Sequence, residues 1–377
     1  MVTSYKIIES EMDNRGSKSE IQYPQPNKIS VKEQRVDDSY LIKYLLIKLR
    51  YTLMNFERNY QIKFPSKQFR KFSTLNNQSN LNPFYVTGLI DAEGSFSTTI
   101  YLSNKYKTGW CVQSCFQISL HSRDLDLLLQ LQKYFCGIGS ISKGKTRNSV
   151  NYSVSGIKDL TTVIIPHFDN FPLLTQKRAD FLLFKQIVVL MNKKEHLTIL
   201  GLEKIINFKA SINLGLSDIV KSKFKNIVPV ERPIINITTI PEPQWIAGFV
   251  SGEGNFGVKF KKSLKNKTGY QIQLIFIITQ HQRDINLIKV LQKYFGSGTI
   301  RKDPRHPAVY LILINFSDLT KKIIPIFEKY PIFGIKQLDY LDFCKVAKLM
   351  SEGKHLINEG LNLIRTIKSG MNKGRKL

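Results

Sequence analysis

The sequence is organised by an internal repeat, and its best-preserved part is a short motif. The first copy reads VTGLIDAEGSF at residues 86–96, and the second reads IAGFVSGEGNF at residues 246–256. Each copy has one carboxylate in the same position, Glu93 in the first and Glu253 in the second. A repeat on this scale decides the architecture of a chain. Two equivalent acids predict a pseudo-symmetric site where the copies meet.

The repeat extends well beyond the motif. The segment His-Ser-Arg-Asp at 121–124 recurs as His-Gln-Arg-Asp at 281–284. Beyond Cys136, which looks like a one-residue insertion, Lys177 still matches Lys336. A tandem duplication without a shared site is the alternative interpretation. The fidelity of the acid motif favours a shared site.

The repeat also predicts how the chain is divided. The expected segments are an N-terminal leader at 1–82, a first domain at 83–220, a linker at 221–241 and a second domain at 242–377. The leader does not fit the repeat, and its Pro, Ser, Asn and charged residues predict a largely disordered segment. Four prolines in and beside the linker predict an extended tether over the contact between the domains.

The charge balance indicates the kind of partner. The chain carries a formal net charge of +27 and has a sequence pI near 9.8. Positive charge along the whole sequence is typical of a protein that binds a polyanion, and nucleic acid is the first candidate. A solvated basic surface or binding to an anionic membrane is the alternative. No run of about 20 apolar residues is present, so no membrane-spanning helix is expected. The four cysteines lack CxxC spacing, which predicts a reducing compartment and no zinc site.

Each copy has the pattern α–β–β–α–β–β–α–α. In the first copy, Asn82 and Pro83 are favourable residues for starting a helix, which we expect over 84–92. Glu242 and Pro243 stand at the same place in the second copy.

Small residues lie four apart in both motif helices. Gly88 and Ala92 occupy these positions in the first copy, and Gly248 and Gly252 in the second. Residues four apart share one face of a helix. The shared spacing predicts that the two motif helices pack closely against each other at the seam between the domains. The alternative is that each glycine only eases packing against its own sheet.

The strands that follow each motif alternate between apolar and polar residues. The apolar face is expected to pack on helices, and the other face is rich in Ser, Thr, Gln, Asn, Lys and Tyr. A solvated sheet face could have this composition, but these side chains are also the ones that read base edges in the major groove. The predicted DNA-reading residues are Ser95, Ser97, Thr99, Tyr101, Gln113 and Ser119 in the first copy and Asn255, Lys259, Lys261, Gln271 and Thr279 in the second.

The hairpin tips are basic. Lys105 and Lys107 lie in the first hairpin and Lys143 in the second, and such residues grip phosphates. A strand of about ten residues spans roughly 33 Å, which is about ten base pairs. Two copies would therefore cover on the order of 20 base pairs of an asymmetric site.

The two acids predict metal-dependent chemistry. Glu93 and Glu253 are expected at the C-terminal ends of their helices, where the helix dipole disfavours a carboxylate. Two carboxylates at one seam also repel each other, so they need cations, and Mg²⁺ is the hard cation that oxygen ligands suit. Metal-binding acids beside a phosphate activate water and stabilise the leaving oxygen in phosphodiester cleavage. Asp91 is matched by Ser251, and we therefore interpret Asp91 as a helix-end hydrogen-bonding residue and not as a ligand.

The motif pair resembles the single-chain LAGLIDADG homing endonucleases. The flanking segments FQISLHSRD, FPLLTQKRADFLLFKQ and GMNKGR are similar to the fungal mitochondrial intron-encoded branch. The resemblance covers about residues 83–377. It implies an α+β fold of two αββαββα domains that form a DNA-binding β saddle, with the motif helices packed at the interface. It also implies site-specific double-strand cleavage of intron-less alleles with a divalent metal, by a monomer in the mitochondrion.

The resemblance also implies residue roles. The acids of the family motif fall on Glu93 and Glu253. Polar positions on the second strand would be Gln117 and Gln273, and a basic residue on the third strand would be Arg301 or Lys302, or less directly Lys143.

Members of this family can instead be RNA maturases that help their own group I intron RNA to splice, alone or in addition to cleavage. A DNA-binding protein that has lost cleavage is a third possibility. A pure maturase does not need both carboxylates, so the retained pair favours the endonuclease.

Overall fold

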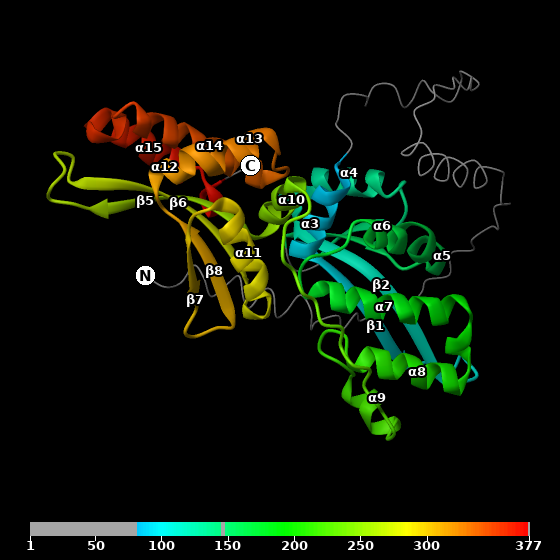
Figure 1. Ribbon diagram of the computed structural model, residues 1–377. Coiled ribbons are helices and arrows are strands. Elements are labelled where there is room, and N and C mark those ends of the chain that lie inside the picture. The colour runs from blue at the N-terminus through cyan, green and yellow to red at the C-terminus, as the bar shows by residue number, and fades with distance from the viewer. Residues whose placement is uncertain (1–80, 145–147, 376–377) are drawn as a thin grey trace, which may run out of the picture. The chain divides into compact units, whose positions relative to one another are not determined.

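The computed structural model describes residues 81–144 and 148–375 (Figure 1). Apart from its last two residues, the predicted leader at 1–82 lies outside the described residues. None of the described helices is long and apolar enough to cross a membrane.

Both copies of the repeat fold into the same order of elements, except that the first copy ends with α9 and the second with a 3₁₀ turn at Asn372–Gly374. The first copy contains α3 (Pro83–Glu93), β1 (Gly94–Leu102), β2 (Trp110–His121), α4 (Leu125–Tyr134), β3 (Ser140–Lys143), β4 (Ser149–Val154), α5 (Ile157–Asp159), α6 (Ile165–Asn170), α7 (Lys177–Asn192), α8 (Ile199–Ala210) and α9 (Asp218–Lys223). The second contains α10 (Pro243–Glu253), β5 (Gly254–Lys262), β6 (Tyr270–His281), α11 (Ile285–Phe295), β7 (Thr299–Lys302), β8 (Ala308–Leu313), α12 (Phe316–Asp318), α13 (Ile324–Lys329), α14 (Ile335–Ser351) and α15 (Asn358–Ser369). Short 3₁₀ turns, η3 (Ser122–Asp124) and η6 (Gln282–Asp284), precede α4 and α11.

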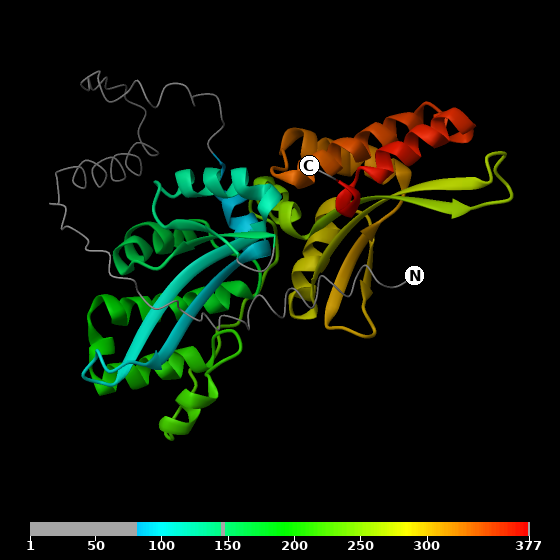
Figure 2. The ribbon, with the colours of Figure 1, turned by 180° about the vertical axis from the view of Figure 1, so that it is seen from behind.

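Each copy has one four-stranded antiparallel sheet. The strand orders are β1-β2-β4-β3 and β5-β6-β8-β7. In the first copy, α7 and α8 lie across one face of β1 and β2, and no described helix of that copy covers the opposite face (Figures 1 and 2). The predicted alternation is confirmed in β1, where Phe96 and Ile100 are buried and Thr99 is exposed. The sheets therefore have one face on the core and one face available to a partner.

The two motif helices, α3 and α10, pack directly on each other. A Cβ atom added at Gly88 would collide with the carbonyl oxygen of Trp245, and one added at Gly248 would collide with that of Tyr85. The backbones can approach this closely only because both positions are glycine. The predicted seam is confirmed.

The two motif helices begin differently. The Asn82 side chain accepts a hydrogen bond of 2.9 Å from the Phe84 amide, as the sequence predicts. Glu242 makes no side-chain capping bond, so the expected equivalence of the two starts is wrong at this point. Short Asn, Asp and Ser side chains are the preferred caps, and Glu is not among them. The first motif helix is one residue longer at each end than the expected 84–92, and in both helices the acid is the last residue, as predicted.

The segment between the copies is extended but held to the first copy. Arg232 forms an ion pair of 2.6 Å with Asp180 and donates to the carbonyl oxygens of Ser211 and Gln176. Asp180 is 2% exposed, and a buried carboxylate needs such a partner. At the end of the second copy, Arg375 binds Asp339 in the same way. The predicted tether therefore has a fixed anchor.

Candidate active site at the seam and its nucleic-acid interface

The packing of α3 against α10 brings the two acids to the same end of the seam. The contacts run from Gly88 beside Trp245 to Glu93 beside Gly252, where an added Cβ would lie 2.9 Å from Glu93 Cγ. The helices are therefore parallel, and their C-termini lie together. Glu93 and Glu253 are partly buried there, each directly before the first residue of a strand.

Two lysines also reach this end of the seam. Lys177 Nζ donates to the carbonyl oxygens of Ile90 and Asp91 at 2.9 Å each. Lys336 Nζ donates to the carbonyl oxygens of Gly252, at 3.0 Å, and Gly254. Each lysine thus binds the C-terminal end of the motif helix in its own copy, where a positive charge is favoured by the helix dipole.

The lysine charges interact with both acids. Burial lowers the pKa of Lys177, whereas the carboxylates of Asp91, Glu253 and Glu93 oppose that shift. Burial likewise lowers the pKa of Lys336, and Glu93 and Glu253 oppose it. Two acids and two lysines therefore form one electrostatic cluster. The repeat marks Lys177 and Lys336 as a matched pair, but only the fold shows that they lie beside the acids.

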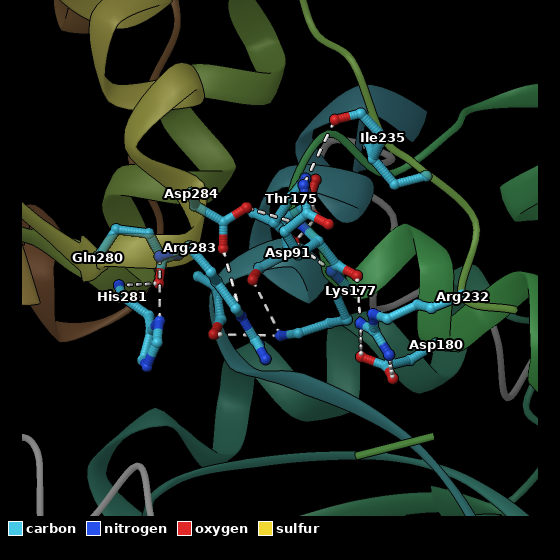
Figure 3. A network of polar contacts seen from close by, with 12 residues as sticks. Asp91, Thr175, Lys177, Asp180, Arg232, Ile235, Gln280, His281, Arg283 and Asp284 are labelled. Atoms are coloured by element: carbon cyan, nitrogen blue, oxygen red, sulfur yellow. Dashed lines mark hydrogen bonds and ion pairs between the residues drawn. The ribbon is translucent and has the colours of Figure 1, made fainter. Parts of the chain in front are cut away.

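Asp91 has the role predicted for it, and it also crosses the seam. Its carboxylate accepts hydrogen bonds from the Thr175 amide and hydroxyl, beside which it lies in Figure 3, and from the Leu174 amide. At 2.8 Å it also accepts one from the indole Nε1 of Trp245 in the other copy. Burial raises the pKa of Asp91, and these donors together with Lys177 oppose the shift. Its side chain is committed to the seam, so the structure gives it no place as a metal ligand.

The reciprocal position has a neutral version of the same contact. Ser251 and the Tyr85 hydroxyl lie 2.7 Å apart. The aspartate–tryptophan pair on one side of the seam is therefore matched by a serine–tyrosine pair on the other.

The acids suit a divalent cation that also binds substrate. Within residues 81–144 and 148–375, no group of three or more His, Cys, Asp or Glu could hold a metal by itself. Mg²⁺ is commonly bound through only one or two carboxylates, with waters and substrate phosphates as its other ligands. Glu93 and Glu253 fit that mode.

The two strand glutamines predicted beside the acids do not occupy equivalent positions. Gln117 lies opposite Ser95, close to Glu93 in the strand register. The same position in the second copy is Ile277, opposite Asn255. Gln273 lies opposite Lys259, further along the sheet, so it is the counterpart of Gln113. Gln117 and Gln273 therefore do not form a matched pair, because strand pairing sets the register and similar local sequence does not.

The basic residues predicted for the third strand lie far from the acids. Arg301 and Lys302 are exposed at the end of β7, not at its start, and Lys143 ends β3 in the same way. β7 is an edge strand separated from β5 by β6 and β8. Three strand spacings of about 4.8 Å place its backbone roughly 14 Å from that of β5. These residues therefore belong to the outer part of the sheet.

The predicted DNA-reading side chains share one face of each sheet. Thr99 pairs with Gln113 and Lys259 with Gln273, so the polar positions of neighbouring strands face the same way. In the second copy, Ile275 and Ile277 interrupt this polar face, and they are only 5% and 6% exposed. The exposed members are Thr99, Tyr101, Lys105, Lys107, Gln113, Lys143, Asn255, Lys259, Lys261 and Gln271, whereas Ser95, Ser97, Ser119 and Thr279 are partly buried.

Comparison with known proteins identifies the family of this chain. The family model described as LAGLIDADG endonuclease matches residues 86–188 and 246–347. The chain is 50% identical to the probable intron-encoded endonuclease 3 of Neurospora crassa, covering 96% of this chain and 70% of that protein. It is 41% identical to the probable intron-encoded endonuclease 2 of the same fungus, covering 78% of this chain and 66% of the relative.

Solved structures give the same result. The homing endonuclease I-SmaMI bound to cleaved DNA is 49% identical, with a TM-score of 0.77 over 78% of this chain and 98% of that chain. A second structure of I-SmaMI, bound to uncleaved DNA in the presence of calcium ions, has a TM-score of 0.76 over 78% of this chain and all of that chain. With its two acids at the ends of two packed motif helices, the chain belongs to the LAGLIDADG endonuclease family and has both repeats in one polypeptide.

Proposed function

We propose that this homing endonuclease cuts both strands of a long, asymmetric DNA site by metal-dependent phosphodiester hydrolysis. The observation that carries the proposal is the meeting of Glu93 and Glu253 at the end of the seam, beside the start of both sheets. One acid comes from each copy, which suits a reaction that has to be performed once on each strand.

The acids and lysines have separate roles in this proposal. Glu93 and Glu253 would hold Mg²⁺, which would supply Lewis-acid stabilisation and a more acidic bound water. Lys177 and Lys336 balance the two carboxylates before DNA binds and offer positive charge to the phosphates afterwards. Gln117, which lies opposite Ser95 in the strand register, would orient water near Glu93, and Ile277 at the equivalent position has no group that could do so.

The sheet faces provide recognition. Thr99, Tyr101, Gln113 and Ser119 have donors and acceptors suited to base edges in the first half of the site. Lys259, Lys261 and Gln271 have suitable groups for the second half of the site. The lysines of the hairpin tips bind phosphates in both halves. A site on the order of 20 base pairs would be needed to occupy both faces.

We further propose that the chain is made and acts in the mitochondrion. Its high content of Ile, Lys and Asn fits the AT-rich codons of mitochondrial genomes. Relatives are named for an ND4 intron of Podospora anserina and a cox1 intron of Schizosaccharomyces pombe.

A cleavage selection tests the proposal. The full chain is incubated with Mg²⁺ and a randomised duplex library, and the cut ends are sequenced. We expect one long site to be recovered, with both strands cut. Glu93→Gln and Glu253→Gln keep the side-chain size but lose the charge, so each should reduce cleavage by at least about 10²-fold while binding is retained.

The outcome separates the endonuclease from its alternatives. Normal cleavage by either glutamine variant would remove that residue from the proposed site. Binding without cleavage at any site would favour the maturase, which the splicing rate of the host intron RNA would then test. Cleavage that continues after EDTA treatment would refute the metal dependence.

A further inference from the structure

The repeated His-x-Arg-Asp segments at 121–124 and 281–284 have no part in the site described so far, although they are among the best-preserved segments of the repeat. In both copies the histidine caps a 3₁₀ turn. His121 Nδ1 accepts from the Arg123 amide at 3.2 Å, and His281 Nδ1 accepts from the Arg283 amide at 3.1 Å. These bonds fix the turns η3 and η6, and each turn ends at the aspartate.

Each aspartate then reaches across to the other copy. Asp284, in the second copy, accepts a hydrogen bond of 2.7 Å from the Gln176 amide in the first. Asp124, in the first copy, accepts one of 2.7 Å from the Ile335 amide in the second. Figure 3 shows Asp284 directed toward the segment that contains Thr175 and Lys177. The two hydrogen bonds are related by the repeat, so both halves of the protein have the same anchor.

The residue held in each case immediately precedes a lysine of the acid cluster. Gln176 precedes Lys177, and Ile335 precedes Lys336. Both lie at the start of a long helix, α7 or α14, where backbone N–H groups lack partners within the helix. In the second copy, Gly334 makes room for the aspartate, because an added Cβ there would lie 2.5 Å from Asp124 Oδ1.

Charge and burial favour a stable anchor. Asp284 is only 4% exposed, and Arg283 Nε lies 3.7 Å from its other carboxylate oxygen. Arg123 adds a second bridge near Asp124 by donating to the Arg375 carbonyl oxygen at 3.2 Å. The electrostatic influence of Asp284 extends to Lys177, and that of Asp124 extends to Lys336.

We infer that Asp124 and Asp284 are positioning residues for cleavage, each fixing the backbone that carries the other copy's lysine beside the acids. The inference rests on the proposed function. Each copy thereby helps to hold the lysine of the other copy in place. A shift of about 1 Å in a group near the reacting atoms can reduce a rate by about 10²-fold, so removal of an anchor should be visible in cleavage.

The test compares strands. Duplex recovered by the cleavage selection is labelled at one end of each strand, and single-turnover cutting is measured for full-length Lys177→Ala, Lys336→Ala, Asp284→Ala and Asp124→Ala. We expect Asp284→Ala to slow by about 10- to 100-fold the same strand that Lys177→Ala slows, and Asp124→Ala to slow the strand that Lys336→Ala slows. Asp284→Asn retains an oxygen that can accept the Gln176 amide, so it should restore most of the rate.

A matched control removes a comparable bond away from the seam. The Thr198 side chain caps α8 by accepting from the Gly201 amide at 3.1 Å, and Thr198→Ala should change neither strand selectively. Equal slowing of both strands by Asp284→Ala, or a match to Lys336→Ala, would overturn the inference.

Amide hydrogen exchange gives a readout that does not need activity. In Asp284→Ala the Gln176 amide should exchange faster while the Ile335 amide is unchanged, and Asp124→Ala should give the reverse. Unchanged exchange at both amides would also refute the anchor. Failure of the wild-type chain to cut any duplex would refute the proposed function, and the exchange pattern would still decide whether the anchor exists.

Discussion

The two sheets share one backbone plan but present different chemistry on the same face. The face of β1 and β2 has uncharged polar groups, such as Ser97, Thr99 and Gln113. The face of β5 and β6 has lysines toward its hairpin and isoleucines toward the acids, including Lys259 and Ile277. Buried positions keep the fold in both copies, whereas the open face can change freely. Under the proposed function, this difference would let two copies of one duplicated domain recognise two different half-sites.

The buried residues of the seam also differ between the two copies. Asp91 and Trp245 form a buried hydrogen bond between a carboxyl group and an indole on one side, and Ser251 and Tyr85 form one between two hydroxyls on the other. The glycines where the backbones touch are the same on both sides. The following predictions test which features of the seam and faces are symmetric and which are not.

The largest effect is expected at the shared glycines. Gly88→Val and Gly248→Val each place a branched side chain against a carbonyl oxygen of the other motif helix. Backbone cannot move aside as a side chain can, so each variant should lose more than about 4 kcal/mol of stability or fail to fold. Ala92→Gly is the control, because the second copy already has Gly252 there, and it should cost only about 1 kcal/mol. Urea unfolding measures all three, and a strong difference between the two valine variants would contradict the symmetry of the seam.

The next largest effect should distinguish the two sides of the seam. Asp91→Ala leaves the Trp245 indole and the Leu174 and Thr175 amides without their acceptor, and should cost about 3–5 kcal/mol. Ser251→Ala removes a hydroxyl that bonds to Tyr85 and donates to the Ala247 carbonyl oxygen, both neutral contacts, and should cost about 1 kcal/mol. Denaturant midpoints of the two variants provide the comparison. Equal losses of stability would show that the Asp91–Trp245 contact contributes no more to the stability of the seam than the Ser251–Tyr85 contact.

A third prediction concerns acid sensitivity: the loss of folding stability at low pH should arise in the first copy. Burial lowers the pKa of His167 to about 3, and the equivalent residue of the second copy is Ile326. A histidine whose folded pKa is depressed stabilises the fold above its unfolded pKa of about 6.5, and that stability is lost as the pH falls toward 3. At pH 4 the loss should reach about 3 kcal/mol. Thermal unfolding should show that the stability of the wild type falls between pH 7 and pH 4, and that the stability of His167→Gln falls less.

The smallest effect is expected in the salt dependence of DNA affinity, which should differ between variants of the two sheet faces. Lys259→Ala combined with Lys261→Ala should reduce the slope of log affinity against log salt by about 0.9 for each phosphate that is no longer neutralised. Thr99→Ala combined with Gln113→Ala should leave that slope unchanged and relax base preference in the first half-site. Binding to the selected duplex between low and moderate salt measures both, and an equal change of slope would contradict the assigned roles.

The sequence predicted what depends on local patterns and repeats. The motif helices, their glycine-mediated seam and the helix-end role of Asp91 all follow from residues within one motif and its copy. The placement of Lys177 and Lys336 could not be predicted in this way, because only the folding of α7 and α14 onto the motif helices brings them to the acids. The Gln273 assignment failed for a related reason. Its neighbours resemble those of Gln117, but the pairing of Gly254 with Ile278 sets the register and places Ile277, not Gln273, opposite Asn255.

The unequal pairs across the seam restrict what can be exchanged between related enzymes. Two first halves assembled together would face Asp91 with Tyr85, and two second halves would face Ser251 with Trp245. Neither combination reproduces a pair found in the chain. A transplanted half should therefore fit best when the residues at its own two positions are matched to those of the half that it joins.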